Sequence, residues 1–229
     1  MELSLRASAR LLNVSEKTIH RWVRQGILPA YRANDQYRFH RAELLEWATS
    51  RGVNVSADIC TEPEDEPIPG GLAAAIRAGG IYHQVEGGDK ADVLRRAVGL
   101  MPLPEEVDRN FVLQLFLARE SLGSTGVGHG VALPHVRSPV VMHVARPMVT
   151  LCFLKRPVAF GAIDGRPVHA LFTMLSPTVR AHLQTIARLS HALRQPGFAA
   201  VISRHGAPEE VLDACEAVDG GIPTYPSAA

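Results

Sequence analysis

The stretch RESLGSTGVGHGVALPHVR, from Arg119 to Arg137, decides how most of this chain is interpreted. Its glycines, at positions 123, 126, 128 and 130, precede a short apolar segment that ends in Pro134-His135. Glycine allows positive φ angles and lets main-chain N–H groups approach an anion closely. A histidine that follows such a loop is positioned to act on that anion. The residues alone therefore predict a phosphoryl site whose nucleophile is the imidazole of His135.

Phosphoryl transfer requires placement of the nucleophile and donors for the charged phosphoryl oxygens. Near pH 7 a large fraction of unperturbed imidazoles is neutral, with a lone pair on one ring nitrogen. The loop offers the hydroxyls of Ser124 and Thr125, which either bind phosphate or cap the turn. It also offers the main chain around Gly126, Gly128 and Gly130. A nucleotide P-loop is excluded because no Gly-Lys-[Ser/Thr] follows, and a dinucleotide fingerprint because the loop follows a helix.

Two further residues are candidates for the same site. The guanidinium of Arg119 can bind phosphate oxygens bidentately, or it can contact carbonyls at the end of its own helix. His182 lies near the start of a predicted helix, where anions are favoured, although an ordinary core histidine is the alternative. The histidines at 129, 135 and 143 lack the spacing of a known zinc motif, so no metal is expected.

The quoted stretch resembles the active-site signature of enzyme IIA domains of the bacterial phosphotransferase system, in the mannitol/fructose and nitrogen-regulatory class. The resemblance continues through CFLKRPVAFGAIDGRPVHALFTMLSP (152–177) and AHLQTIARLSHAL (181–193), and covers roughly Gly70 to Val218. It implies that His135 is phosphorylated by an HPr-type phosphocarrier protein, with Arg119 and His182 in the active site. It also implies that no metal or organic cofactor is required.

Hydrophobic periodicity predicts an α/β fold for this larger part, a mixed β-sheet flanked by helices. We expect a helix that begins at Pro104-Glu105-Glu106, buries positions 107, 111, 112, 115 and 116, and ends at Gly123. Buried strands are expected at Met148–Leu154 and Val168–Leu175. Helices are expected at Thr178–Leu193, with Leu183, Ile186, Ala187 and Leu193 inward, and from Pro208 to Val218.

Residues 1–54 form a separate small unit. Within residues 1–52, nine Lys or Arg residues against five Asp or Glu residues give an excess of +4. The sequences ARLLNVSEKTIHRW (9–22) and GILPA (26–30) resemble the winged helix-turn-helix of excisionase and MerR-like DNA-binding modules. Ser15 is the expected N-cap and Gly26 the stop of the second helix, and Asn34-Asp35 the hairpin turn of the wing. The expected DNA-binding residues are Lys17, His20, Arg21, Arg24, Arg32 and Arg38.

The remaining segments are expected to be connecting or terminal. Residues 55–69 are acidic and rich in proline, as in an exposed linker, and residues 219–229 read as a flexible tail. Three cysteines without CxxC spacing, no signal-type N-terminus and no apolar run that could span a bilayer predict a cytoplasmic protein. The net charge of +1 implies no general polyelectrolyte role.

Together these patterns predict a cytoplasmic transcriptional regulator, in which a DNA-binding unit, working as a homodimer, is joined to a phosphorylated IIA domain. Two alternatives stay open. One is a sugar phosphotransferase component that passes phosphate from HPr to a IIB partner. The other is an interaction protein with a IIA fold that is never phosphorylated, in which case the small basic unit serves as an adaptor.

Overall fold

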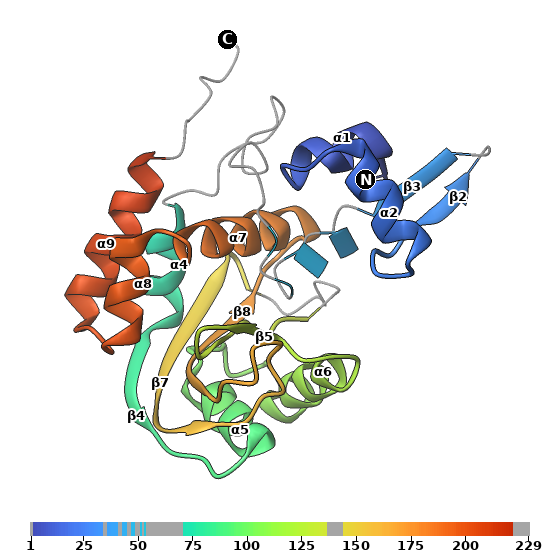
Figure 1. Cartoon of the computed structure of the whole chain (residues 1–229). Helices are drawn as coiled ribbons and strands as arrows, with labels where there is room; N and C mark the ends of the chain where they lie inside the picture. Colours follow the sequence, from blue (N-terminus) through green and yellow to red (C-terminus); the bar gives the residue numbers. More distant parts are fainter. Residues whose placement is uncertain are drawn as a thin grey trace.

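The computed structural model describes residues 2–33, 36–40, 43–44, 47–48, 51, 53, 71–136 and 144–221. These residues form a small N-terminal unit and a larger α/β unit (Figure 1). The proposed linker, residues 55–69, and residues 222–229 of the proposed tail lie outside the described residues.

The N-terminal unit is a helix-turn-helix joined to a small antiparallel sheet. It contains β1 (Glu2–Ser4), α1 (Leu5–Leu11), α2 (Glu16–Arg24), β2 (Tyr31–Ala33) and β3 (Gln36–His40), and its strand order is β1-β3-β2. The hydroxyl of Ser15 caps α2 by accepting the Thr18 N–H at 3.1 Å, as predicted. Gly26 follows the helix with φ of +66°, the conformation expected of a helix stop. The predicted turn Asn34-Asp35 lies outside the described residues.

A compact core holds this unit together. Ile19 of α2 and Phe39 of β3 are fully buried, together with Leu12, Leu44 and Ala48. The last two lie after the wing, where the described residues 43–44 and 47–48 are helical. β1 was not predicted, and its pairing with β3 connects the start of the chain to the wing.

The larger unit is built around a five-stranded sheet of order β4-β7-β8-β6-β5. Its strands are β4 (Ile81–Val85), β5 (Gly126–Gly128), β6 (Val131–Ala132), β7 (Met148–Val158) and β8 (Val168–Leu175). The β4–β7 and β6–β8 pairs are parallel, whereas β7–β8 and β5–β6 are antiparallel. The predicted mixed sheet is therefore confirmed, and β8 has the bounds that its sequence predicts.

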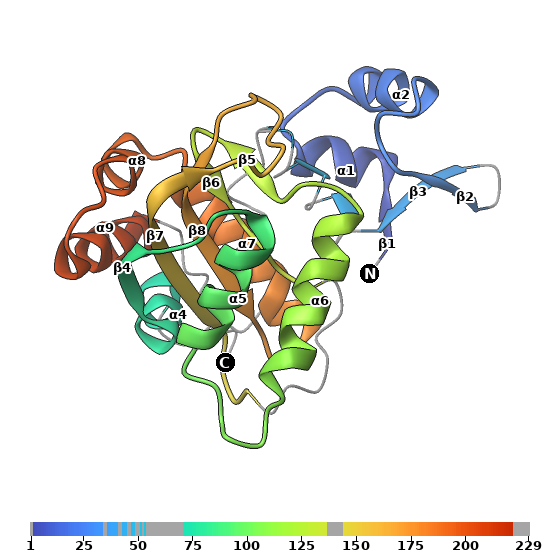
Figure 2. The same cartoon turned by 90° about the horizontal axis from the view of Figure 1, so that it is seen from below.

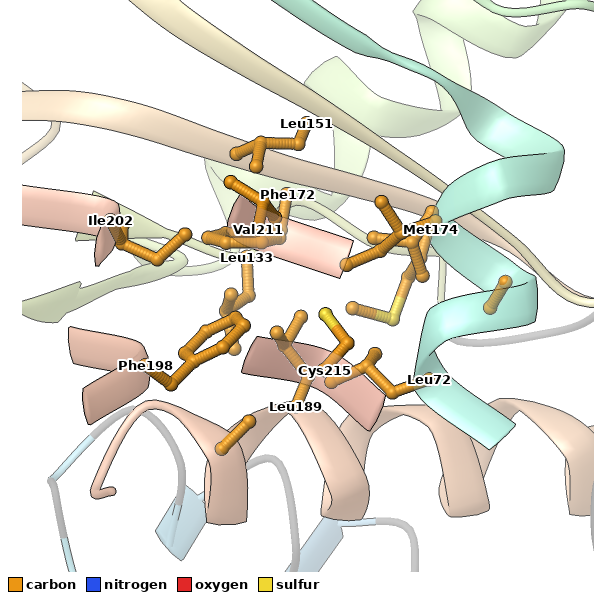
Figure 3. Packing of buried hydrophobic residues seen from close by; sticks show 14 of the residues in the cluster. Leu72, Leu133, Leu151, Phe172, Met174, Leu189, Phe198, Ile202, Val211 and Cys215 are labelled. Atoms are coloured by element: carbon orange, nitrogen blue, oxygen red, sulfur yellow. The ribbon is translucent and has the colours of Figure 1, made fainter. Parts of the chain in front are cut away.

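Helices cover both faces of this sheet (Figure 2). One face carries α4 (Gly71–Gly79), α7 (Val179–Ala192), α8 (Pro196–Ser203) and α9 (Pro208–Gly221), and the other carries α5 (Lys90–Leu100) and α6 (Arg109–Ser121). Side-chain alternation along β8 sorts the core accordingly: Phe172 and Met174 pack with the first helix group, and Leu171 and Leu175 with the second. Figure 3 shows the first core, where Phe172 and Met174 meet Phe198, Leu189 and other apolar side chains.

The predicted start of α6 was wrong. Residues 104–106 form a turn, and the helix begins at Arg109 because the Asp108 carboxylate accepts the N–H groups of Asn110 and Phe111. The buried face is also shifted. Val112, Leu113 and Phe116 are buried, whereas Phe111 is 49% exposed.

The predicted end of the last helix was three residues short, because α9 continues to Gly221. Asp219, assigned to the tail, is structural. Its carboxylate accepts the N–H groups of Leu72 and Ala73 at 3.0 Å and pairs with Arg188 at 2.8 Å. This contact joins α9 to the first turn of α4 and to α7.

Contacts between described residues of the two units include the following. Leu11 of α1 packs partly against the larger core, and the Arg194 guanidinium donates to the main-chain carbonyl of Val53. Among the described residues, no helix combines the length and the apolar character needed to cross a membrane.

Candidate phosphoryl-transfer site

The glycine-rich segment is a short β-hairpin rather than an open loop. β5 and β6 pair antiparallel through Gly126–Ala132 and Gly128–Val131, and His129 and Gly130 turn between them with φ of +52° and +75°. β6 then pairs with β8, which brings the hairpin onto the main sheet. The glycines do mark a place where other groups come close to the main chain, as the sequence suggests. These groups are side chains of this protein.

Each glycine of the hairpin is packed against a neighbour. A Cβ at Gly126 would lie 2.7 Å from the Cβ of Ala162, and one at Gly130 would lie 2.3 Å from the His169 ring. At Gly128, φ is +92° and a Cβ would lie 3.2 Å from the Asp164 carboxylate. These glycines are therefore explained by packing and by positive φ.

Glu120 organises the start of the segment, and the sequence did not single it out. Its carboxylate is 7% exposed and accepts the Thr125 hydroxyl at 2.6 Å and the Thr125 N–H at 3.1 Å. The Nζ of Lys90 lies 2.9 Å from Oε1 of Glu120 and balances the negative charge of this carboxylate. The Thr125 hydroxyl proton thus serves this buried carboxylate.

The other predicted donors of the segment also have acceptors within the protein. The Ser124 hydroxyl donates to the Phe160 carbonyl at 2.6 Å and accepts the Gly126 N–H at 3.0 Å. The His129 N–H donates to Asp164 at 2.8 Å. These three hydrogen bonds and the Glu120–Thr125 contacts hold the hairpin in place, so Ser124 and Thr125 stabilise the turn in this conformation.

His135 lies three residues after β6, the second strand of the hairpin. It forms an isolated parallel bridge with Met174 of β8 and is 5% exposed. Its Nδ1 lies 2.7 Å from the Leu133 carbonyl oxygen, which is only an acceptor. Nδ1 must therefore carry the hydrogen in this contact, and in the neutral ring Nε2 then holds the lone pair.

His182 is brought beside His135 by the connection from β8 to α7. The ring centroids are 5.4 Å apart and the ring planes are inclined by 44°. His182 is 4% exposed and lies near the start of α7, as predicted, and Thr178 is the N-cap of this helix. The two predicted histidines therefore share one buried location near the N-terminus of a helix.

Ser176, which the sequence did not single out, lies at the start of the connection from β8 to α7. It directly follows β8, two residues after Met174, and is 5% exposed. Strand alternation puts its side chain on the face that carries Met174 and α7, the face to which the Leu133–His135 spacing also assigns His135. Within the described part of the chain, the Ser176 hydroxyl has no hydrogen-bond partner.

Arg119 lies in the last turn of α6. Its Nη1 donates to the Gly123 carbonyl at 3.0 Å, the helix-end contact that was the alternative to phosphate binding. Gly123 itself has φ of +149° directly after the helix. In this conformation Arg119 helps to shape the entry into the hairpin.

The expected DNA-binding side chains of α2 recur at helical spacing, on one face of that helix. Lys17, His20, Arg21 and Arg24 of α2 are all exposed. The His20 ring meets Tyr37 of β3 edge-on, with centroids 5.5 Å apart, so α2 and the wing are in contact. Arg38 lies on β3, where it donates to Gln36 at 3.4 Å, and the side chain of Arg32 lies outside what the structure describes.

Comparison with known proteins assigns a family to each unit. Residues 75–218 match the family model described as phosphoenolpyruvate-dependent sugar phosphotransferase system, EIIA 2. Residues 2–52 match a helix-turn-helix domain family. These ranges agree with the two units seen in the structure.

Individual relatives include regulatory and sugar-specific proteins. A nitrogen regulatory protein of Pseudomonas aeruginosa is 37% identical over 113 residues, which are 48% of this chain and 71% of the relative. A nitrogen regulatory protein of Bradyrhizobium diazoefficiens is 37% identical over 90 residues, and the match spans 57% of its length. The fructose-specific EIIABC component of Bacillus subtilis is 28% identical over 133 residues, only 20% of that larger protein.

Solved structures agree with this assignment. The crystal structure of the nitrogen regulatory protein IIA-Ntr from Neisseria meningitidis has a TM-score of 0.56 at 28% identity, covering 63% of this chain and 98% of that one. IIA mannitol of Escherichia coli, at 22% identity and a TM-score of 0.51, shares the fold. Since the family model spans well over half of the sequence, this chain belongs to the EIIA 2 family of the phosphoenolpyruvate-dependent sugar phosphotransferase system, with a helix-turn-helix domain at its N-terminus.

Proposed function

We propose that this protein is a cytoplasmic DNA-binding regulator whose IIA domain accepts a phosphoryl group on His135 from an HPr-type carrier. The observation that carries the proposal is the buried pairing of His135 with His182, 5.4 Å apart, with Nδ1 of His135 on the Leu133 carbonyl. The names of the nitrogen regulatory relatives support a regulatory role.

The chemistry needs no cofactor. The Nε2 lone pair of His135 attacks the phosphorus of the carrier's phosphohistidine, and an N–P bond forms as the donor N–P bond breaks. The bonding electrons return to the donor ring nitrogen. The proton stays on Nδ1 of His135 and is donated in a hydrogen bond to the Leu133 carbonyl, which stabilises the ring as it gains positive character.

Three side chains are proposed to support the transferred group. His182 donates to a phosphoryl oxygen, and the Ser176 hydroxyl supplies a second donor from the same face. Arg119 contributes a guanidinium after it leaves the Gly123 carbonyl. The N-terminus of α7 adds its dipole to this location, because the first turn of a helix favours negative charge.

The DNA-binding half of the proposal rests on α2. Its four exposed basic or imidazole side chains, Lys17, His20, Arg21 and Arg24, suit the major groove, and Arg38 with Arg32 on the wing suits the backbone. A single small unit binds weakly, so we propose a homodimer that reads two half-sites.

Phosphorylation of His135 is proposed to change operator affinity. The added charge, about −1.5 to −2, is screened over about 8 Å at physiological salt, so direct repulsion of DNA is a weak route. A change in dimer geometry or partner docking near His135 is the proposed route. Couplings of this kind typically change affinity by roughly 5- to 150-fold.

A second candidate function is a sugar phosphotransferase relay to a IIB partner. The fructose-specific relative favours it, as does the similarity of the fold to IIA mannitol, for which a complex with phosphorylated IIB mannitol is solved. In this case His135 has the same chemistry, but its phosphoryl group passes onward to IIB.

The test combines labelling with DNA binding. The full chain is incubated with phosphoenolpyruvate, enzyme I and HPr-type carriers, and its mass is measured. Operator affinity is then compared for phosphorylated and unphosphorylated protein at fixed salt. Mass increase with altered affinity supports the regulator, and mass increase with equal affinity and discharge to IIB supports the relay. If the mass does not increase, the result favours the alternative of an interaction protein whose IIA fold is not phosphorylated.

A further inference from the structure

A cavity lies at the C-terminal end of α7, whereas His135 lies near the N-terminal end of this helix. Its volume is about 520 Å³, within the range of small-molecule sites. It is bordered by the β5–β6 hairpin, the start of β8, the end of α7 and α8. His169 of β8 precedes Met174, the partner of His135, by five residues, or roughly 16 Å along a strand. The cavity is therefore separate from the phosphoryl site.

Both of the permanently charged side chains that line this cavity are cationic. Two guanidinium groups, Arg166 and Arg194, line it together with two imidazoles and two hydroxyls, those of His129, His169, Ser190 and Ser203. The described residues that line it include no Asp or Glu. The remaining lining is largely aliphatic, from Val127, Val131, Leu193 and Ile202. Cations beside an apolar wall suit a molecule with an anionic head and an apolar body.

The surrounding contacts fix these groups in place. Asp164 accepts the N–H groups of both His129 and Arg166, which holds the hairpin turn and the β7–β8 loop together. Those two hydrogen bonds lower the pKa of Asp164, because main-chain N–H groups stabilise its carboxylate. His169 is oriented by His205, with 2.9 Å between His169 Nδ1 and His205 Nε2.

Arg194 is the central residue of the argument. It is partly buried, and this burial lowers the pKa of its guanidinium from the ordinary value, although a guanidinium remains charged at neutral pH. It also donates to the Val53 carbonyl, at the end of the N-terminal unit. A ligand bound to Arg194 is therefore linked to the N-terminal unit through the hydrogen bond from Arg194 to Val53.

We infer that this cavity binds a small organic anion, a carboxylate or a phosphate monoester with an aliphatic or aromatic body. Arg166 and Arg194 bind the anionic head. The hydroxyls of Ser190 and Ser203 orient it, and the aliphatic wall holds the body. The inference does not depend on phosphorylation of His135, because none of these residues belongs to that site.

The experiment uses the isotopically labelled full chain and matched probes. Benzoate and phenyl phosphate are the anions, and benzamide and benzyl alcohol are their neutral counterparts. Binding is followed through the main-chain amide signals by two-dimensional NMR. We expect both hairpin and α7–α8 amides, at residues 127–131 and 190–203, to shift with an anion, and neutral probes to bind at least about tenfold more weakly.

Variants assign the site. Arg166→Gln and Arg194→Gln should each weaken binding of the anion by about tenfold or more, because each removes a charged hydrogen-bond donor. Arg204→Gln is the matched control: Arg204 directly follows α8, pairs with Glu210 and does not line the cavity, so binding should be unchanged. His135→Ala should also leave binding unchanged.

The outcomes are decisive. A preference for benzoate or for phenyl phosphate supports the inference and names the head group. Three results overturn the inference. They are equal binding of the neutral probes, shifts confined to the amides around His135 and His182, and no shift with either anion. An Arg204→Gln effect equal to that of the two cavity arginines also overturns it.

Discussion

His135 and His182 lie with their ring centroids 5.4 Å apart, although 46 residues separate them in the chain. One strand pairing and one chain connection produce this contact. His135 pairs with Met174 at the end of β8, and α7 begins four residues after β8 ends and returns across the same face. The end of the sheet therefore determines where the two imidazoles meet.

His135→Ala is expected to abolish labelling by the carrier. The adduct on the unaltered chain should be acid-labile and alkali-stable, as a phosphoramidate is. Since Nδ1 contacts the Leu133 carbonyl, phosphorus should be found on Nε2, which heteronuclear NMR of the phosphorylated ring distinguishes. His129→Ala, an exposed histidine of the hairpin turn, is the control and should label fully. Full labelling of the His135→Ala protein would disprove the assignment.

His182→Ala and Arg119→Ala are expected to slow labelling without relocating it. Loss of a donor to a developing oxyanion costs about 3 kcal/mol, roughly a hundredfold in rate. Rapid-quench measurement of phosphoryl transfer from the carrier gives the rates, with Arg109→Ala as a second arginine of α6. Unchanged rates in both variants would leave His182 as a core residue and Arg119 as a helix-end contact with Gly123.

Ser176→Ala is expected to change rate and stability in opposite directions. The buried hydroxyl lacks a described partner, so its removal should raise the free energy of unfolding by about 1 kcal/mol. If this hydroxyl donates to the phosphoryl group, transfer should slow by roughly five- to tenfold. Chemical denaturation and transfer kinetics measure both quantities. A more stable protein with an unchanged rate would assign Ser176 to packing alone.

Residues of α2 are expected to dominate binding to duplex DNA. Arg21→Ala and Arg24→Ala should weaken binding and reduce the salt dependence, because each phosphate contact releases counterions. Arg51→Ala is the matched control, since this exposed arginine stacks over Trp47 and is not part of α2 or of the wing. Fluorescence anisotropy at several salt concentrations measures both effects. Absence of binding to any genomic fragment at low salt would favour an adaptor role.

Stability is expected to fall as the pH drops below about 6.5, the ordinary histidine pKa. Burial lowers the pKa values of His169 and His205 in the folded protein, and the positive charge of a neighbouring histidine lowers each further. The unfolded chain then binds protons that the folded protein does not, so stability is present above pH 6.5 and is lost as the pH falls through the lowered pKa values. Thermal melts between pH 7.5 and 5.5 test this. His205→Gln should flatten the profile, and an unaltered profile would contradict the argument.

The sequence by itself predicted features that depend on neighbouring residues. Ser15 caps α2, as predicted, because an N-cap acts on an N–H group three residues away. Thr178, predicted only as the first residue of a helix, caps α7 in the same way. β8 and the start of α9 follow from local apolar patterns and Pro208. Similar local signals, Asp89 before α5 and Pro196 at the start of α8, would have predicted two helices that we did not predict. The glycine-rich stretch singled out His135, and the predicted helix start together with the family resemblance singled out His182.

Only the tertiary structure decided which groups meet. The sequence could not show that Ala162, Asp164 and His169 fill the space beside the hairpin glycines, or that Glu120 takes the Thr125 hydroxyl. It gave no sign of Ser176, whose surroundings depend on strand pairing. These contacts join residues far apart in the chain, and strand register and helix packing set them. A one-residue change of register would move every side chain of a strand to the opposite face of the sheet.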